Sequence, residues 1–222
     1  MAAAPKKKAK PEPAESDLPA NARERQKQAT QALILQAALE EFSERGFDGT
    51  STRDIAARAG VHHALINYHF SSKDTLWREA VTFLFERQAM EVLIPRPNDK
   101  DFPDRRAYAK EVIRRVVVYF AHHPEHARLM VQESCSDSER FRWATDSFVT
   151  RTSRAAEQFI RFMQAEGFLP KAPVPQLVYI FVGAAQLFYV LAPEVQRIWN
   201  IDPFKEKAIN DHVDALVAVL MR

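Results

Sequence analysis

The sequence predicts an all-α protein with about nine helices. Only five of the 222 residues are glycine, and few stretches alternate apolar and polar residues as half-buried strands do. Serine and aspartate residues that can cap a helix recur just ahead of runs with apolar residues at helical spacing. The 46% apolar composition is enough to bury a sizeable core, and the length allows one or two domains.

Residues 1–22 form a zone of different composition. Alanine, proline and lysine dominate this zone, and Leu18 is its only branched aliphatic residue. Such a segment has too little apolar surface to fold by itself, so we expect a disordered basic and proline-rich tail.

Two short helices with a tight turn between them are predicted in residues 51–70. Ser51 with Asp54 fits a capping box, in which the serine hydroxyl and the carboxylate satisfy early backbone N–H groups. A helix therefore begins at about Thr52. Gly60 stands where a helix ends in the left-handed conformation that only glycine adopts cheaply, and Val61 is placed to pack back on that helix.

The second of these helices runs from about His62 to Phe70 and has two different sides. Ile66 and Phe70 fall on one side, while the opposite arc carries His63, Ala64, Asn67 and Tyr68. A short helix of this kind after a turn suits insertion into the major groove of DNA. A helical hairpin without any ligand is the alternative interpretation of the spacing alone.

The surrounding residues complete a known pattern. They are Ile34, Ala37, Ala38 and Phe42 on a first helix, Gly46-Phe47, the run from Thr50 to Ala56, Ala59-Gly60-Val61, Tyr68-His69-Phe70, and Lys73 with Leu76. From Ile34 to Val81 the chain thereby resembles the DNA-binding domain of the tetracycline-repressor (TetR) family. Three residues differ from those common in that family: His62, Ala64 and Asn67. We expect these differences to change which operator sequence is recognised and to leave the fold the same.

The resemblance implies a helix-turn-helix DNA-binding domain at residues 23–72 and a larger helical effector-binding and dimerisation domain at 73–222. The residues that it implies in contacts with double-stranded DNA are Thr52, Arg53, His63, Ala64, Leu65, Asn67, Tyr68, His69 and Lys73. Residues 63–65 would face base edges, and the residues from Asn67 onward would hold phosphates. His69 has a second interpretation, in which it only packs the domain.

Basic residues extend toward the same end of the chain. Three interpretations of the four lysines within residues 6–10 stay open. They contact DNA phosphates, they only keep the tail soluble, or they form a nuclear-import signal. Arg23, Arg25 and Lys27 come just before the first helix. Because the net charge is only +2, attraction to nucleic acid depends on where the charges lie.

Six further helices follow from the same local signals. The fourth begins at Lys73, after the Ser71–Asp74 capping box, and ends at about Leu93 ahead of Pro95 and Pro97; the fifth runs from Asp104 to about His122, and the sixth from Pro124 to about Cys135. The seventh begins at the Ser136–Glu139 capping box and ends at Glu166 and Gly167. The eighth begins after Pro173 and Pro175 and ends near Ala192-Pro193, and the ninth runs to the C-terminus with Asp202 as its cap and Pro203 as its first residue.

The eighth helix is apolar nearly all the way round from Leu177 to Leu191, so both of its sides need cover. A second copy of the chain is the most economical cover, and a ninth helix with an apolar stripe fits the same four-helix contact. The predicted homodimer residues are Leu177, Ile180, Gly183, Ala184, Leu187, Val213, Leu216, Val217 and Leu220. A membrane span is the rival, but about 15 residues are short for a bilayer that needs about 20.

Aromatic and soft side chains are abundant in the second half of the chain. Most of them belong to an ordinary core, but the resemblance implies an effector pocket among the fourth to eighth helices. The residues expected at a small apolar or aromatic effector are Phe120, Met130, Glu133, Phe148, Phe159, Met163, Tyr179, Gln186 and Tyr189.

Other chemistry finds little support in the sequence. Cys135 is the only cysteine, which excludes an internal disulfide, and no apolar segment follows the basic N-terminus, so we expect a cytoplasmic protein. His122, His123 and His126 lack the cysteines of a usual zinc site, so no metal or other cofactor is expected. No nucleophile elbow, phosphate-binding glycine loop or zinc-protease motif appears, which argues against an enzyme.

Two classes of function remain. The favoured one is a ligand-responsive DNA-binding repressor, which binds a palindromic operator as a homodimer. The alternative is a helical small-molecule-binding or dimerisation protein without ligand-controlled release of DNA.

Overall fold

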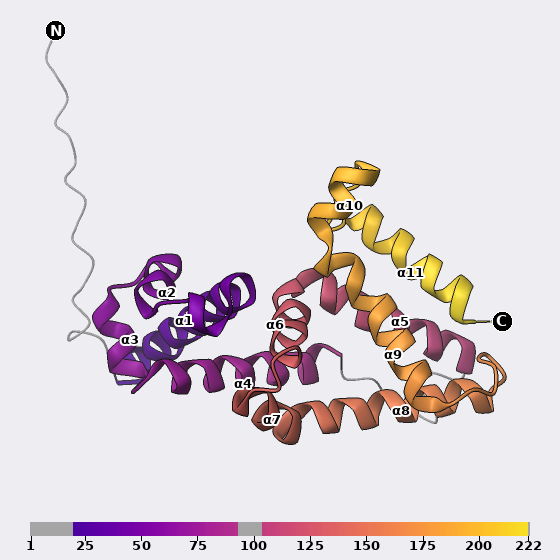
Figure 1. Ribbon diagram of the computed structural model, residues 1–222, viewed down its shortest axis with the longest axis horizontal. Coiled ribbons are helices and arrows are strands. Elements are labelled where there is room, and N and C mark those ends of the chain that lie inside the picture. Colours follow the sequence, from indigo (N-terminus) through magenta and orange to yellow (C-terminus); the bar gives the residue numbers. More distant parts are fainter. Residues whose placement is uncertain (1–19, 93–103, 222) are drawn as a thin grey trace, which may run out of the picture.

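The computed structural model describes residues 20–92 and 104–221, and these residues form helices labelled α1 to α11 and no strand (Figure 1). In Figure 1, α1, α2 and α3 lie at one end of the molecule, and α4 connects them to the remaining helices. The predicted tail up to Pro19 and the predicted proline loop after Val92 lie outside the described residues.

The first four helices build one core. They are α1 (Ala20–Gly49), α2 (Thr52–Ala59), α3 (His63–His69) and α4 (Lys73–Glu91). Phe42, Ile55 and Trp77 are among the buried side chains that pack together in this core. Since α1 begins at Ala20, its first turn includes the last three residues of the segment that we expected to be a tail.

A second core is built by α5 (Arg105–His122), α6 (Pro124–Ser134), α8 (Thr150–Ala165), α9 (Val174–Val190) and α11 (Glu206–Leu220). The two short helices α7 (Glu139–Ala144) and α10 (Ala192–Trp199) add no buried side chain to it. The buried side chains of this core include Ile113 of α5, Ile160 of α8, Phe181 of α9 and Leu216 of α11.

The two cores meet along α4 and α6. Leu129 of α6 and Ala144 of α7 belong to the first core, whereas Ala127 of α6 belongs to the second. Both α4 and α6 pack directly against α1. The first three helices are therefore attached to the body by two helices and not only by the chain connection into α4.

The capping box predicted at α2 is confirmed. The Asp54 backbone N–H donates to Ser51 Oγ over 3.2 Å, and the Ser51 N–H donates to the Asp54 carboxylate over 3.3 Å. The predicted starts of α5 at Asp104 and of α6 at Pro124 are also confirmed, and the Asp104 side chain caps α5.

Two other predicted capping boxes are wrong by one or two residues. Ser72, rather than Ser71, accepts the N–H of Thr75 at the start of α4. Ser138, rather than Ser136, caps α7. The Ser136 hydroxyl instead donates to the carbonyl of Glu133, because it lies in the turn that closes α6.

The eighth predicted helix ends near Ala192-Pro193 as expected, because α9 stops at Val190, but a further helix, α10, begins at Ala192. Pro193 lies in the first turn of α10, where its missing N–H leaves no hydrogen bond unmade. α10 ends at Trp199 and is capped by Asn200, whose backbone is left-handed with a φ of 53°. The helix α10 was therefore not predicted from the sequence.

The predicted start of the last helix is also wrong. Asp202 and Pro203 precede a turn, and α11 begins only at Glu206. The Asp202 carboxylate accepts the N–H of Phe204 over 3.1 Å, so it caps this turn instead of the helix.

The predicted seventh helix is continuous but not uniform. A π-helical segment, Thr145–Val149, lies between α7 and α8. Within its wide turn, the Thr150 hydroxyl donates to the Thr145 carbonyl over 2.9 Å. Gly167 follows α8 with a φ of 75°, as predicted. A single π turn of this kind often marks a functional position in a helix.

Among the described residues, no single helix is long and apolar enough to cross a bilayer. α9 and α10 meet the criterion only as a pair, and the two are bent by 70° at the break between them.

Candidate nucleic-acid interface

Two buried side chains hold α3 in place. Ile66 and Phe70 are 1% and 3% exposed, and they belong to the same core as Ile55 and Ala56 of α2. This confirms which side of α3 packs. The opposite side of α3 is left to solvent.

The turn between α2 and α3 has the predicted geometry. Gly60 adopts the left-handed conformation, with φ 67° and ψ 28°. The Val61 N–H donates to the carbonyl of Ala56 over 3.0 Å, which closes α2 and directs the chain into α3.

Two histidines organise the start of α3. His62 Nδ1 accepts the N–H of Ala64 over 3.3 Å, so an imidazole caps the helix. Thr52 Oγ1 and His63 Nε2 lie 3.0 Å apart and join the first turns of α2 and α3. This cap was not predicted, because histidine is not among the residues that usually cap a helix.

The predicted DNA contacts all lie on this end of the molecule. Arg53, Ala64, Asn67 and Tyr68 are exposed, while Thr52, His63, Leu65, His69 and Lys73 are half-buried. The Tyr68 side chain is 70% exposed, and its ring meets the His69 ring edge-on at 5.0 Å between centroids. The helix therefore presents a tyrosine, an amide and a methyl group together.

A hollow beside α3 carries partial positive charge. It is lined by Thr50, Ser51, Thr52, Ile66, Asn67, Phe70, Ser72 and Lys73. Ser51 and Ser72 cap α2 and α4, so the N-terminal ends of two helices meet at this hollow. Helix N-termini and the Lys73 ammonium both favour an anion.

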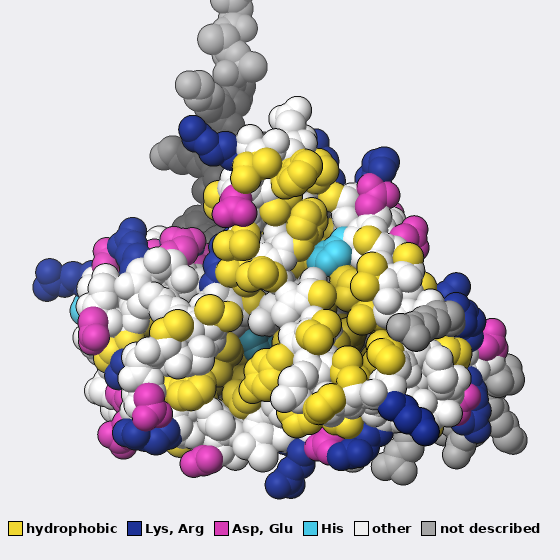
Figure 2. Space-filling model, turned by 45° about the vertical axis from the view of Figure 1, so that its right-hand side comes forward, with side chains coloured by type: hydrophobic (Ala, Val, Ile, Leu, Met, Phe, Trp, Pro, Cys, Tyr) yellow, Lys and Arg dark blue, Asp and Glu magenta, His cyan; other side chains and the backbone are white. Residues whose placement is uncertain are grey.

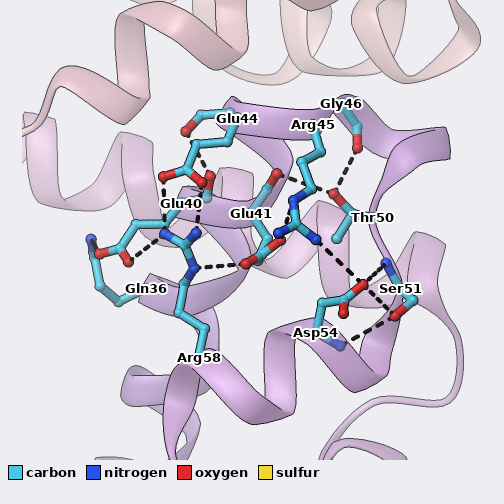
Figure 3. Close-up of polar contacts among 11 residues, drawn as sticks. Gln36, Glu40, Glu41, Glu44, Arg45, Gly46, Thr50, Ser51, Asp54 and Arg58 are labelled. Carbon is cyan, nitrogen blue, oxygen red and sulfur yellow. Dashed lines mark hydrogen bonds and ion pairs between the residues drawn. The ribbon is translucent and has the colours of Figure 1, made fainter.

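Arg58 ties α2 to α1 through three carboxylates (Figure 3). Its guanidinium reaches Glu40 at 3.2 Å, Glu41 at 2.8 Å and Glu44 at 2.6 Å. The hydrogen bond from Arg58 holds the pKa of the Glu44 carboxyl below its usual value, although desolvation opposes this shift. The network fixes the orientation of α2, and with it the position of α3.

The end of α1 is closed by a threonine hydroxyl. Thr50 Oγ1 donates to the carbonyls of Gly46 at 2.8 Å and of Glu41 at 3.1 Å (Figure 3). Gly46 has a φ of 73°, so the regular part of α1 stops there. Both contacts keep the loop into α2 close to α1.

The structure does not bring the predicted effector residues together. Four of them lie in or against the second core: Phe120, Phe159, Met163 and Tyr189. Two others, Met130 and Phe148, lie against the first core. Of the remaining three, Glu133 is buried, Gln186 is half-buried and Tyr179 is exposed. Glu133 accepts a hydrogen bond from the Ser138 hydroxyl at 3.0 Å. Tyr179 is the one member of the set that lines a groove between α8 and α9.

The predicted dimer residues divide between the interior and the surface of the single chain. Leu177, Val213, Leu216 and Leu220 are buried in the second core, Gly183 and Val217 are half-buried, and Ile180, Ala184 and Leu187 are exposed. Tyr179 on α9 and Val219 on α11 are 76% and 81% exposed and were not in the predicted set.

The histidines near α6 take part in hydrogen bonds. His126 is buried, and its Nδ1 lies 2.7 Å from the Tyr119 hydroxyl. His123 Nε2 lies 3.0 Å from the Glu91 carboxylate. Over the part of the chain that the structure describes, no group of three or more His, Cys, Asp or Glu residues is placed to hold a metal ion.

Residues 34–80, which span α2, α3 and the parts of α1 and α4 that pack on them, match the model of the bacterial regulatory proteins of the tetR family. Over these residues the chain is similar to the TetR family. The match covers the turn at Gly60, the buried pair Ile66 and Phe70, and the exposed side of α3.

Sequence relatives of this chain are named as regulators of transcription. The HTH-type transcriptional repressor Rv3405c of Mycobacterium tuberculosis is 58% identical over 45 residues, which are 20% of this chain and 24% of the repressor. The aligned residues thus span about a quarter of that relative. The HTH-type transcriptional repressor SCO4008 of Streptomyces coelicolor is 28% identical over 180 residues, which cover 78% of this chain and 85% of the repressor.

A solved structure with a similar fold is that of AibR in complex with isovaleryl coenzyme A and operator DNA. It superposes with a TM-score of 0.65 at 16% sequence identity and covers 86% of this chain and 98% of AibR. The similarity therefore extends over both cores.

Proposed function

We propose that this protein regulates transcription by binding double-stranded DNA, and that it acts as a repressor at a near-palindromic operator. The observation that carries the proposal is the two-sided α3. Ile66 and Phe70 hold one side in the core, while Ala64, Asn67 and Tyr68 stand in solvent on the other. The names of the two repressor relatives support the same assignment.

In this proposal, residues 23–72 are the DNA-binding domain and α3 reads the major groove. His63, Ala64 and Leu65 face base edges, where an imidazole can hydrogen-bond guanine and an alkyl group can touch the thymine methyl. A backbone phosphate sits in the hollow between the ends of α2 and α4, beside Asn67 and Lys73. We also propose a cytoplasmic location for this protein.

We propose further that the DNA-binding form is a homodimer joined through α9, α10 and α11. Figure 2 shows hydrophobic side chains gathered on the projecting upper part of the molecule, where Figure 1 places α10, and on the face below it. The exposed large apolar side chains of this region are Tyr179, Ile180, Leu187, Leu191, Ile198, Trp199, Ile201, Phe204 and Val219. A contiguous apolar surface of this extent is typical of a protein–protein contact.

A two-fold dimer gives the repressor its operator. Two copies of α3 then face the same side of the duplex in major grooves about 34–36 Å apart, and the half-sites form an inverted repeat. Residues 73–222 supply this dimerisation in the proposal. They also bind a small, largely apolar effector. Its binding changes the distance between the two α3 helices, which then no longer fit the two half-sites, and DNA is released. The AibR complex, which holds a small molecule and operator DNA, supports such a pairing of ligands in this fold.

The test is selection of DNA fragments by the purified protein, followed by anisotropy titrations of the selected site. We expect an inverted repeat bound by two chains. Tyr68→Ala removes a phosphate contact and weakens binding to every sequence, whereas His63→Ala relaxes the preference at one base position by about 1–3 kcal/mol.

Lys110→Ala provides the control, because Lys110 is exposed on α5, far along the chain from α3. It should bind the operator as the unaltered protein does. Selection of no preferred sequence, or equal binding by the Arg53→Ala, His63→Ala and Tyr68→Ala variants, would remove the assignment of α3 as the reading helix.

A further inference from the structure

A groove separates α8 from the first turns of α9, and its two walls differ in character. Arg154, Glu157 and Arg161 line the α8 wall, and Val174 and Val178 line the α9 wall. The three charged residues recur at spacings of three and four, so they form one stripe along α8. The groove therefore combines a charged stripe with an apolar wall, and no side chain of the described part fills it.

The charges of the groove do not cancel. Arg161 donates to the Glu157 carboxylate over 2.8 Å, which neutralises one cation. Arg154 is exposed and makes no hydrogen bond or ion pair within residues 20–92 and 104–221. One guanidinium thus remains available beside the apolar wall. The N-terminal end of α9, which has no side-chain cap, adds partial positive charge at the same wall.

A second observation points to a missing partner at the other end of the groove. Thr145, the first residue of the π-helical segment, lines the groove, and its hydroxyl oxygen is buried without a hydrogen-bond partner in the described part. Buried hydroxyl groups are normally paired, so an orphan of this kind calls for a ligand atom or a water molecule. π turns are also frequent at functional positions.

We propose that this groove binds a small amphipathic carboxylate. The carboxylate lies on Arg154, whose planar guanidinium matches its two oxygens, and the apolar part lies along Val174 and Val178. A single charge fits better than a polyanion, because Glu157 stands between the two arginines and repels further negative charge.

The groove is connected to the first core, which gives the ligand a route to the proposed DNA interface. Phe148, in the π-helical segment, stacks on Phe85 of α4 with 4.9 Å between ring centroids. The Trp143 ring, one turn earlier, lies 4.9 Å from the Arg78 guanidinium of α4. A ligand that shifts the segment therefore displaces side chains that pack on α4. This effector role rests on the function proposed above, whereas binding in the groove does not.

The binding test uses the full chain, calorimetry, and decanoate as the probe, with 1-decanol as its uncharged counterpart. We expect decanoate to bind more tightly than decanol. Arg154→Gln should weaken decanoate binding at least tenfold and leave decanol binding unchanged, and Arg154→Lys should restore part of the loss. Arg151→Gln is the matched control, because Arg151 is exposed on the same helix and does not line the groove.

Three outcomes would overturn the proposed site: no decanoate binding at millimolar concentration, equal binding of decanoate and decanol, or equal decanoate affinity of the Arg154→Gln and unaltered proteins. Operator binding is measured separately with and without decanoate. If decanoate binds as expected and the affinity for the operator stays the same, the groove is a binding site for carboxylates but does not control DNA binding. If no operator is bound at all, the proposed function fails while the calorimetry still decides the groove.

Discussion

The guanidinium of Arg87 on α4 lies 2.6 Å from the carboxylate of Glu125 at the start of α6, and the two side chains are only 12% and 8% exposed. The same guanidinium donates to the Gln36 amide oxygen of α1 over 2.7 Å. One buried ion pair thus joins the three helices α1, α4 and α6 at the place where the two cores meet. It links the position of α1 to that of α6.

Removal of one partner of this pair should destabilise the protein strongly. Glu125→Gln leaves the Arg87 charge buried without a counter-ion, which costs about 3–5 kcal/mol in the free energy of unfolding. Urea unfolding followed by circular dichroism measures the loss. Asp211→Asn is the control, because Lys207 and Asp211 form a pair of the same 2.6 Å length with side chains 85% and 63% exposed, and it should cost less than about 1 kcal/mol. Similar losses in both variants would contradict the structural importance of the buried pair.

The stability of the fold should fall in mild acid. Burial lowers the pKa of His126 from 6.5 to about 3, so between these values the unfolded chain binds a proton that the folded chain rejects. The stabilisation is complete above pH 6.5 and is lost as the pH falls toward 3.

Glu125 adds to the acid sensitivity at lower pH. Burial alone would raise its pKa, but the hydrogen bond from His123 and the charge of Arg87 outweigh burial and lower the pKa from 4.5 to about 2. Its contribution is lost as the pH falls from 4.5 toward 2.

The urea midpoint should therefore decrease between pH 7 and pH 5 mainly through His126, and His126→Gln should flatten this part of the profile. An unchanged slope in that variant would assign the decrease to other groups.

Gly183 offers a test of the dimer face that spares the single chain. A Cβ atom built at Gly183 meets no atom within 4 Å, so a side chain there has room in the single chain. Replacing a glycine inside a helix also favours that helix by up to about 1 kcal/mol. Gly183→Phe should consequently keep or raise the urea midpoint while it shifts the protein toward monomer in sedimentation. Ala155→Phe, at an exposed position of α8, should leave the oligomeric state unchanged. A Gly183→Phe protein that dimerises normally would exclude close helix approach at this position.

Lys73 should contribute to the salt dependence of DNA binding. Its ammonium lies 4.4 Å from the centre of the Phe47 ring, which holds it beside the hollow at the start of α4. Lys73→Gln should reduce the slope of log affinity against log salt by about 0.9, the value for one phosphate contact, without changing the preferred operator. The Lys110→Gln protein should keep the full slope. Equal slopes for the two variants would place Lys73 away from the phosphates.

The sequence by itself determined the helix-turn-helix, because the features that build it are local. A capping box links Ser51 to a residue three positions away, Gly60 sets its own backbone conformation, and the spacing of Ile66 and Phe70 defines the buried side of α3. Each of these depends on a few neighbouring residues, so the pattern and the structure agree there.

The same local rules could not decide the ends of the later helices. Ser71 and Ser72 both precede α4, and both Ser136 and Ser138 precede α7, so the choice of cap depends on which serine the surrounding packing orients toward the helix. Pro193 suits the end of one helix and the start of the next equally well by its chemistry.

Only the tertiary structure decided which polar and apolar groups meet across the fold. Arg87 and Glu125 are 38 residues apart and look like ordinary charged positions of two helices, yet they form the buried pair at the junction of the cores. The helix α9 is likewise apolar nearly all the way round by its sequence, but the fold buries Leu177 and leaves Ile180 in solvent. Burial depends on the angles at which distant helices cross, and these angles follow from the packing of the whole chain, which no local spacing encodes.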